Sequence, residues 1–333
     1  MKTIELIVPC YNEEKCIALL CENVKKVFAD MPEYDFIITY IDDGSKDSTL
    51  EEIKKVAAVE NTGGGHIRYI SLSRNFGKEA AIYAGLSKVV GDYVALLDAD
   101  LQHPPELLKQ MVAAIEEGYD CASARRVSRR GEPFIRSVFS RAFYYVINHV
   151  AAINLVPGST DYRLMKRSVV KAIVSMTERE RFTKGIYSWV GFKNKWIEYE
   201  NVERVAGNSK WSFMGLLRYA YSGFIAFATT PLRGVVYFGM LIVLASVVGA
   251  IHIFIGALNT PSVLRNGYAT LMIVILFLGG VIITILGMIG EYMARIYMEV
   301  KQRPIYFTRE TNIGHETAEE MINGDKESEK WED

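Results

Sequence analysis

Two long stretches without charged side chains constrain the fold of this 333-residue chain more than any other feature. Residues 234–258 read GVVYFGMLIVLASVVGAIHIFIGAL, and residues 268–290 read YATLMIVILFLGGVIITILGMIG. About 20 consecutive apolar residues are enough for a helix to cross the hydrocarbon core of a bilayer. Buried helices of a water-soluble protein are the alternative, but two such runs joined by a short connection favour a transmembrane hairpin.

The distribution of basic residues predicts the orientation of this hairpin. The connection holds only Arg265, whereas the two flanks hold Arg218, Arg233, Arg295, Lys301 and Arg303. Lys and Arg concentrate in the cytoplasmic segments of membrane proteins. We therefore expect a multi-pass protein of the cell membrane with its large N-terminal part and both termini in the cytoplasm. The opening sequence MKTIELIVPCYNEE turns polar too early for a signal peptide.

Composition excludes some partners and cofactors. Lys plus Arg total 38 against 39 for Asp plus Glu, so the total charge indicates no nucleic-acid partner. The four cysteines form no CxxC pair, which favours free thiols in a reducing compartment. The five histidines are scattered and indicate no zinc site. From about residue 309 the chain is charged and poor in apolar residues, which predicts disorder.

The first hundred residues alternate apolar runs with helical patterns. This alternation is typical of βαβ units and a parallel sheet. The runs predict strands at 4–11, 35–44, 67–73 and 92–100, and helices at 13–29, at 48–59, from 78 onward and at 104–118. In such sheets ligands bind at the carboxyl ends of the strands. The polar residues that fall at these ends are Asn12, Asp42, Asp43, Asp98 and Asp100.

The stretch LLDADLQHPPE, residues 96–106, suggests a divalent cation site. Mg²⁺ and Mn²⁺ prefer oxygen ligands and bind substrate phosphates through one or two carboxylates. Asp98, Asp100 and Gln102 offer such oxygens at alternate positions. A turn is the alternative, because Asp and Pro both favour turns. Neither a GxxxxGK[ST] loop nor a GxGxxG motif after the first strand is present to bind phosphates instead.

Two further stretches look amphipathic. Residues 133–150 place apolar side chains at roughly helical spacing, with Arg136 and Arg141 as charged members. Residues 211–227 are apolar and aromatic with one arginine. Such helices can lie in the headgroup region of a membrane, although packing on the sheet is the alternative.

Several motifs in order carry a resemblance to a known family. IVPCYNEE, IDDGSKDST, SRNFGKEAA and LLDADLQHPPE resemble the inverting glycosyltransferases of family 2, which share the GT-A fold. STDYRLM (159–165), RFTKGIYSWVGF (181–192) and NVERVAGNSKWSF (201–213) are similar to the bacterial polyprenol-phosphate branch, which includes bactoprenol glucosyltransferases beside dolichol-phosphate mannose synthase. The resemblance covers nearly everything except the tail.

This resemblance implies a domain layout. Residues 1–210 would form the catalytic domain, with an α/β, GT-A fold (Rossmann-like, with a mostly parallel sheet). Within this domain, residues 133–150 would form an interfacial amphipathic helix. A juxtamembrane amphipathic helix at 211–231 follows, then two transmembrane helices within 232–292 (about 234–258 and 268–290). Residues 293–333 form a cytoplasmic tail that is partly disordered. A homo-oligomer such as a tetramer is also implied.

The resemblance also implies a role for particular residues. A nucleotide sugar would contact Pro9, Tyr11, Glu13, Asp42, Asp43 and Asp98. Mg²⁺ or Mn²⁺ would be held by Asp98, Asp100 and Gln102. The lipid phosphate would be bound by Arg125, Arg136, Ser140, Arg204 and Lys210. Arg126 is an alternative to Arg125 for binding the lipid phosphate. The alternative function for these arginines is a solvent-exposed basic face.

The implied activity is inverting transfer of a hexose, glucose or N-acetylglucosamine, from a UDP-sugar to undecaprenyl phosphate. The β-linked product would serve the glycosylation of cell-envelope polysaccharides. Catalytic roles fall to Asp98, Asp100 and Asp161, where Asp161 either orients the acceptor or makes a structural hydrogen bond. His103 is expected to be a structural turn residue.

Three other functions stay open. A processive polysaccharide synthase of the same superfamily would carry a QxxRW motif, which is absent, and more spans. A catalytically inactive membrane scaffold is disfavoured by the intact Asp98/Asp100 pair. A glycosyltransferase with a soluble or protein acceptor would work without any polyprenyl phosphate.

Overall fold

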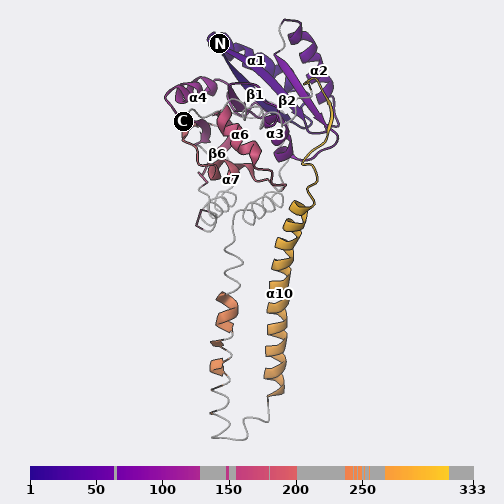
Figure 1. Ribbon diagram of the computed structural model, residues 1–333, viewed down its shortest axis with the longest axis vertical. Coiled ribbons are helices and arrows are strands. Elements are labelled where there is room, and N and C mark those ends of the chain that lie inside the picture. The colour runs from indigo at the N-terminus through magenta and orange to yellow at the C-terminus, as the bar shows by residue number, and fades with distance from the viewer. Residues whose placement is uncertain are drawn as a thin grey trace, which may run out of the picture. The chain divides into compact units, whose positions relative to one another are not determined.

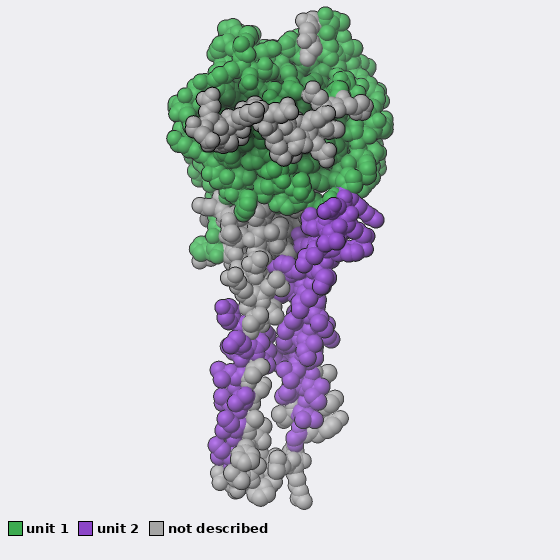
Figure 2. All heavy atoms as spheres, in the orientation of Figure 1, with its two compact units in different colours: residues 1–226, 304–333 green, residues 227–303 purple. Residues whose placement is uncertain are grey.

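The computed structural model describes residues 1–63, 66–127, 148–149, 155–179, 181–200, 237–242, 244–245, 247–249, 251, 255 and 267–314. The chain divides into two compact units, which Figure 2 distinguishes by colour. Unit 1 comprises residues 1–226 and 304–333, and unit 2 comprises residues 227–303.

Unit 1 contains an eight-stranded sheet with the order β7-β5-β6-β4-β1-β2-β3-β8. In chain order its strands are β1 Lys2–Cys10, β2 Tyr34–Asp42, β3 Ile67–Leu72, β4 Tyr93–Leu96, β5 Cys121–Arg126, β6 Ser159–Lys166, β7 Asn194–Tyr199 and β8 Thr308–Thr311. Strands β4, β1, β2 and β3 are parallel, as is β7 to β5. β6 is antiparallel to β4 and β5, and β8 is antiparallel to β3. The predicted α/β fold with a mostly parallel sheet is confirmed.

Helices lie between many of these strands along the chain (Figure 1), and the four α-helices before residue 118 are those that the alternation predicts. The helices described in unit 1 are α1 Ile17–Ala29, α2 Thr49–Glu60, α3 Lys78–Leu86, α4 Leu107–Glu116, α6 Arg167–Ser175 and α7 Thr183–Trp189. Successive strand residues point to opposite faces. Ile4, Leu6 and Val8 of β1 join the core that holds α1 and α4. On the other face, a Cβ on Gly85 of α3 would collide with Ile7, so glycine permits this close packing.

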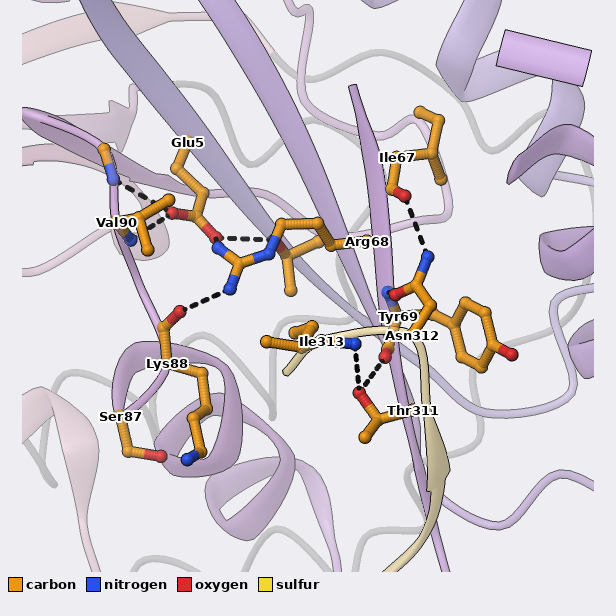
Figure 3. A network of polar contacts seen from close by, with 12 residues as sticks. Glu5, Ile67, Arg68, Tyr69, Ser87, Lys88, Val90, Thr311, Asn312 and Ile313 are labelled. Atoms are coloured by element: carbon orange, nitrogen blue, oxygen red, sulfur yellow. Dashed lines mark hydrogen bonds and ion pairs between the residues drawn. The ribbon is translucent and has the colours of Figure 1, made fainter. Parts of the chain in front are cut away.

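A polar network ties together the strands β1, β2 and β3 (Figure 3). Glu5 of β1 is fully buried and pairs with Nη1 of Arg68 at 2.9 Å. Its carboxylate also accepts hydrogen bonds from Thr39 Oγ1 at 2.6 Å and from the backbone N–H groups of Val90 and Gly91 at 2.7 and 3.1 Å. A buried charge is tolerated only when such partners satisfy it. The network therefore fixes the loop that leads into β4.

The prediction of disorder from about residue 309 is wrong for β8. This strand completes the sheet beside β3, where Glu310 pairs with Lys54 at 2.8 Å. The Asn312 side chain accepts from Tyr69 N at 2.7 Å and donates to Ile67 O at 3.0 Å (Figure 3). Edge pairing uses backbone groups that every residue carries. A low apolar content therefore does not prevent a segment from becoming an edge strand.

Unit 2 contains the long helix α10, Tyr268–Val300. Within the described residues, one helix is long and apolar enough to cross a membrane, with a 24-residue window Phe277–Val300 of mean hydropathy 1.7. Its apolar side chains are exposed, including Ile283 at 72% and Leu286 at 61%. The first predicted span, 234–258, is described only in short pieces, so the two-helix hairpin stays a prediction. The predicted amphipathic helices at 133–150 and 211–231 lie almost entirely outside the described residues.

Candidate active site

The loops that follow β1 and β2 hold each other at the carboxyl edge of the sheet. Asn12 adopts a left-handed backbone conformation with φ of 53°, which asparagine tolerates better than most residues. Its N–H donates to Ser45 Oγ at 3.0 Å, and its side-chain oxygen accepts from Lys46 N at 2.8 Å. Glu13 N donates to Thr49 Oγ1 at 2.8 Å. The half-buried Tyr11 and Glu13 are therefore carried on a loop of fixed shape.

Asp42 and Asp43, at the end of β2, are both buried and both accept hydrogen bonds from neighbouring loops. Asp42 accepts from Ser45 N at 2.9 Å and from Ser71 Oγ at 2.8 Å. Asp43 accepts from the N–H groups of Phe76 and Gly77 at 2.7 and 2.9 Å. Burial raises the pKa of Asp43, although these two N–H groups oppose the rise. Each carboxylate oxygen has a further lone pair that a ligand can use.

Lys78 brings together two carboxylates from different strands. Its Nζ lies 2.7 Å from Oδ1 of Asp98, which follows β4, and 2.8 Å from Oδ2 of Asp161 on β6. Burial disfavours the ionised form of Asp98, but the Lys78 ammonium and His103 outweigh burial and hold its pKa well below the usual range. The pKa of Asp161 is also lowered, because Lys78 and Lys184 outweigh burial. Both carboxylates are therefore charged at neutral pH.

A turn follows Asp98, and the side chain of His103 returns to it. Leu101 has a φ of 56°, and Asp100 Oδ1 accepts from Gln102 N at 3.1 Å. His103 is buried, with Nε2 facing Asp98 Oδ2 at 3.7 Å and Nδ1 lying 2.7 Å from the hydroxyl of Tyr199. Burial raises the pKa of Tyr199 to about 12, so its hydroxyl stays protonated at neutral pH. His103 therefore bridges Asp98 and Tyr199 through its two ring nitrogens.

The oxygen donors present fit a hard divalent cation. The carboxylates of Asp98 and Asp100 and the amide oxygen of Gln102 lie within one short turn, and such oxygens suit Mg²⁺ or Mn²⁺. Lys78 and His103 face the two carboxylate oxygens of Asp98, at 2.7 and 3.7 Å. No group of three or more His, Cys, Asp or Glu that could hold a metal is found among the described residues.

The predicted lipid-phosphate residues are described only in part. Arg125 of β5 is partly exposed, donates from Nε to Pro157 O at 3.2 Å and lies 3.4 Å from Glu198. The other predicted members of this group, Arg136, Ser140, Arg204 and Lys210, lie outside the described residues. The structure places the predicted nucleotide and metal residues near the carboxyl ends of the neighbouring strands β1, β2 and β4, while the roles of all the predicted site residues stay a prediction.

Sequence reasoning missed two contributors to this site. Lys78 lies in the quoted motif SRNFGKEAA, at the first residue of α3 and after the loop that follows β3. Its place in a motif that already carried the family resemblance was the available signal. The sequence around Tyr199 does not indicate a role in the site. Its contact with His103 joins the end of β7 to the turn after β4, and these segments lie far apart in the sequence.

Comparisons with known proteins show what this chain is similar to. Residues 5–174 match the family model described as glycosyl transferase family 2. A Bacillus subtilis (strain 168) protein named as a glycosyltransferase, CsbB, is 45% identical over 310 residues, covering 93% of this chain and 92% of that protein. The SfII prophage-derived bactoprenol glucosyl transferase of Shigella flexneri is 36% identical over 312 residues, covering 94% and 99%. Among solved structures, a mannosyltransferase of Pyrobaculum calidifontis is 16% identical with a TM-score of 0.44, covering 62% and 58%.

Proposed function

We propose, from the premise that this chain belongs to glycosyl transferase family 2, that it transfers a hexose from a UDP-sugar to undecaprenyl phosphate. Support for the acceptor comes from the Shigella flexneri relative, whose name specifies a bactoprenol glucosyl transferase. This chain matches that relative over 99% of its length, so the similarity extends beyond the family domain. Glucose and N-acetylglucosamine are the two candidate sugars.

The observation that carries this proposal is the gathering of Asp98 and Asp161 around one ammonium group at the carboxyl edge of the sheet. Glycosyl transfer to a phosphate has to balance the negative charge of the donor diphosphate and of the acceptor. The carboxylates would hold a divalent cation against the donor diphosphate, and Lys78 limits the repulsion between Asp98 and Asp161. The Tyr199–His103 pair additionally fixes the environment of Asp98.

The proposed roles follow from the positions of the side chains. Asp98, Asp100 and Gln102 would hold Mg²⁺ or Mn²⁺, which when bound supplies positive charge to the departing diphosphate. Pro9, Tyr11 and Glu13, on the β1 edge and its loop, would contact the nucleotide. Asp42 and Asp43, which already fix the surrounding loops, would contact it from the end of β2.

The acceptor hardly needs a general base. The second pKa of a phosphate monoester lies near 6, so the nucleophilic oxygen is largely ionised at neutral pH. Asp161 would therefore orient the acceptor or the sugar. Direct attack on the anomeric carbon inverts it, so an α-linked donor yields a β-linked lipid-phosphate sugar.

Unit 2 would anchor the protein in the membrane where this acceptor resides. The apolar window Phe277–Val300 and its exposed side chains support one span. Within the same unit, Phe238 and residues of α10 line a common cavity, which supports pairing with a first span at about 234–258. We propose a multi-pass protein with a cytoplasmic catalytic domain at 1–210, an interfacial helix at 133–150, a juxtamembrane helix at 211–231, both termini in the cytoplasm and a homo-oligomeric assembly.

The test uses the purified full-length protein with undecaprenyl phosphate and a panel of radiolabelled UDP-sugars. We expect transfer of one hexose that stops after chelation and returns with Mn²⁺ or Mg²⁺. Asp100→Asn should lose turnover, while Arg136→Ala should mainly raise the KM for the lipid. Asp30→Asn, on a surface ion pair with Lys109, is the matched control and should behave as wild type.

Each contrary result points to a different function. Transfer that is unchanged by exhaustive chelation would contradict the metal role. Transfer to a soluble acceptor without polyprenyl phosphate would contradict the lipid acceptor, and a polymeric product would indicate a processive synthase. Absence of UDP release under all conditions would favour a catalytically inactive scaffold.

A further inference from the structure

The segment that follows α10 in the chain lies against the loop that leads from β3 to α3. Residues 304–312, here called the C-terminal strap, belong to unit 1 and contain β8. Beyond the pairing of β8 with β3, Phe307 O accepts a hydrogen bond from Ser73 N at 2.9 Å. The strap therefore continues past the end of β3 onto residues 73–77, the β3–α3 loop.

Two aromatic side chains of the strap contact this loop and the helix after it. The rings of Phe307 and Phe76 are 6.3 Å apart between their centroids. The rings of Tyr306 and Tyr83, on α3, are 6.4 Å apart and edge-on, and the Tyr306 hydroxyl lies 3.2 Å from Ser87 Oγ, directly after that helix. Aromatic pairs at such separations are favourable beyond the area that they bury. The strap thus holds both the loop and α3.

The β3–α3 loop is also the segment that fixes Asp43. The N–H groups of Phe76 and Gly77 donate to its carboxylate at 2.7 and 2.9 Å. A Cβ on Gly44 would collide with the backbone of Arg74, so the loop directly contacts the turn that follows β2. The position of Asp43 therefore depends on a loop that the strap supports from its other side.

Two further groups of the candidate site depend on the same support. Ser71 of β3 pairs with Glu310 of β8, and its hydroxyl donates to Asp42 at 2.8 Å. Lys78 follows the loop directly as the first residue of α3, and its ammonium contacts Asp98. The strap thus supports the segments that hold both carboxylates at the end of β2 and the lysine beside β4.

We propose that the C-terminal strap is a positioning element of the donor site, in which Tyr306 and Phe307 hold the β3–α3 loop in the shape that binds the nucleotide. This inference rests on the proposed function, in which Asp42 and Asp43 contact the nucleotide. Tyr306 and Phe307 act through the loop and α3 rather than by touching the donor. Nucleotide binding should therefore depend on a segment that lies outside the match to the family model, residues 5–174.

The test compares the full-length wild type with the double variant Tyr306→Ala/Phe307→Ala, which removes both ring contacts and leaves the backbone of β8. Hydrogen exchange of the N–H groups of residues 73–77 should become at least about fivefold faster, since each aromatic pair contributes roughly two- to tenfold to an equilibrium. The dissociation constant of UDP, measured by calorimetry with Mn²⁺ present, should rise at least about threefold, because affinity falls with the fraction of molecules whose loop is ordered.

Two further variants separate positioning from general destabilisation. Phe36→Ala is the matched control, because it removes a ring pair with Phe28 near the start of β2, at the opposite end of that strand from Asp42. It should lower the unfolding temperature and leave the dissociation constant of UDP unchanged. Phe307→Tyr keeps a ring at a position that is 55% exposed, so it should bind UDP like the wild type.

Three results would overturn the proposal. The first is a dissociation constant of UDP that is equal in the double variant and the wild type. The second is an equal rise in Phe36→Ala. The third is unchanged hydrogen exchange at residues 73–77, which would show that the strap only covers the edge of the sheet. Should the double variant fail to fold, Phe307→Ala alone provides the same test, with a rise of about twofold expected for one ring contact.

Activity distinguishes failure of this proposal from failure of the proposed function. A wild type that binds UDP but transfers no sugar to undecaprenyl phosphate would refute the function and leave the role of the strap. Transfer by the double variant with an unchanged KM for the UDP-sugar would refute the role of the strap and leave the function. A raised KM for the UDP-sugar with an unchanged KM for undecaprenyl phosphate would support the strap, because it acts on the donor site.

Discussion

Lys78, the first residue of α3, forms an ion pair with Asp161 of β6 at 2.8 Å. The same ammonium contacts Asp98, so it links the helix after β3 to two strands on the other side of β1. Removing it would leave two charged carboxylates facing each other.

Lys78→Met should therefore lower kcat by about a hundredfold, since loss of one charged group in a preorganised site costs roughly this much. Steady-state kinetics with a UDP-sugar and undecaprenyl phosphate would measure the effect. Lys109→Met, which removes a surface ion pair with Asp30, should retain wild-type kinetics. Wild-type turnover by Lys78→Met would show that the ion pair is only structural.

Tyr199→Phe should release His103 from one of its two contacts. Without the hydroxyl, Nδ1 loses its hydrogen-bond partner and the ring that faces Asp98 is no longer fixed. We expect a stability loss of about 1 kcal/mol for one hydrogen bond, together with reduced turnover. The ¹⁵N chemical shifts of His103 would report the tautomer directly, and unchanged shifts would contradict the assignment.

Glu5→Ala should destabilise unit 1 strongly. It leaves Arg68 without its carboxylate partner, and breaking a buried pair in this way costs about 3–5 kcal/mol. Urea unfolding followed by tryptophan fluorescence would measure the change. Glu116→Ala, which removes an exposed ion pair with Lys2, should cost no more than about 1 kcal/mol. Similar losses in both variants would argue against the network in Figure 3.

Asn312→Ala should weaken the attachment of β8. The side chain makes hydrogen bonds to both Tyr69 N and Ile67 O, and its loss leaves these groups without that partner. About 1–3 kcal/mol should be lost, and limited proteolysis should cut the segment after residue 303 faster. Glu310→Gln, at a partly exposed ion pair, should change this cutting rate little. Equal cutting of Asn312→Ala and wild type would contradict the observed pairing.

The four cysteines should not react in the folded protein. All are buried and free, and burial raises the pKa of Cys21 and of Cys121 to about 11. Because the thiolate is the reactive form, little of it is present at pH 8. Mass spectrometry after iodoacetamide treatment should find four unmodified thiols in the native protein and four alkylated ones after unfolding in denaturant. Modification of the native protein would show that a cysteine is accessible.

The sequence predicted those features that depend on local pattern. Apolar runs located β1, β2, β3 and β4, and the position of Asp98 directly after such a run placed it at the carboxyl edge of the sheet. The order of the motifs predicted the family. These predictions succeed because the periodicity and the ends of a strand depend on residues that are neighbours in the sequence.

Contacts between distant segments could not be predicted in the same way. Glu5 lies in an apolar strand, yet the arginine that neutralises it comes from β3. His103 looked like a turn residue because its partner, Tyr199, is close only once β7 pairs with β5. The polar segment that forms β8 was predicted to be disordered. Amino-acid composition indicates whether a segment can be buried, but it does not indicate whether an unpaired strand edge is available for pairing.

The position of β8 has a consequence for biosynthesis. During translation, β3 is made early, whereas its edge partner leaves the ribosome only after the whole of α10 has been synthesised. An emerging chain therefore carries an open edge while α10 is still being synthesised, and open edges invite pairing with other chains. Ribosomes that stall between α10 and β8 should yield a product that aggregates through β3.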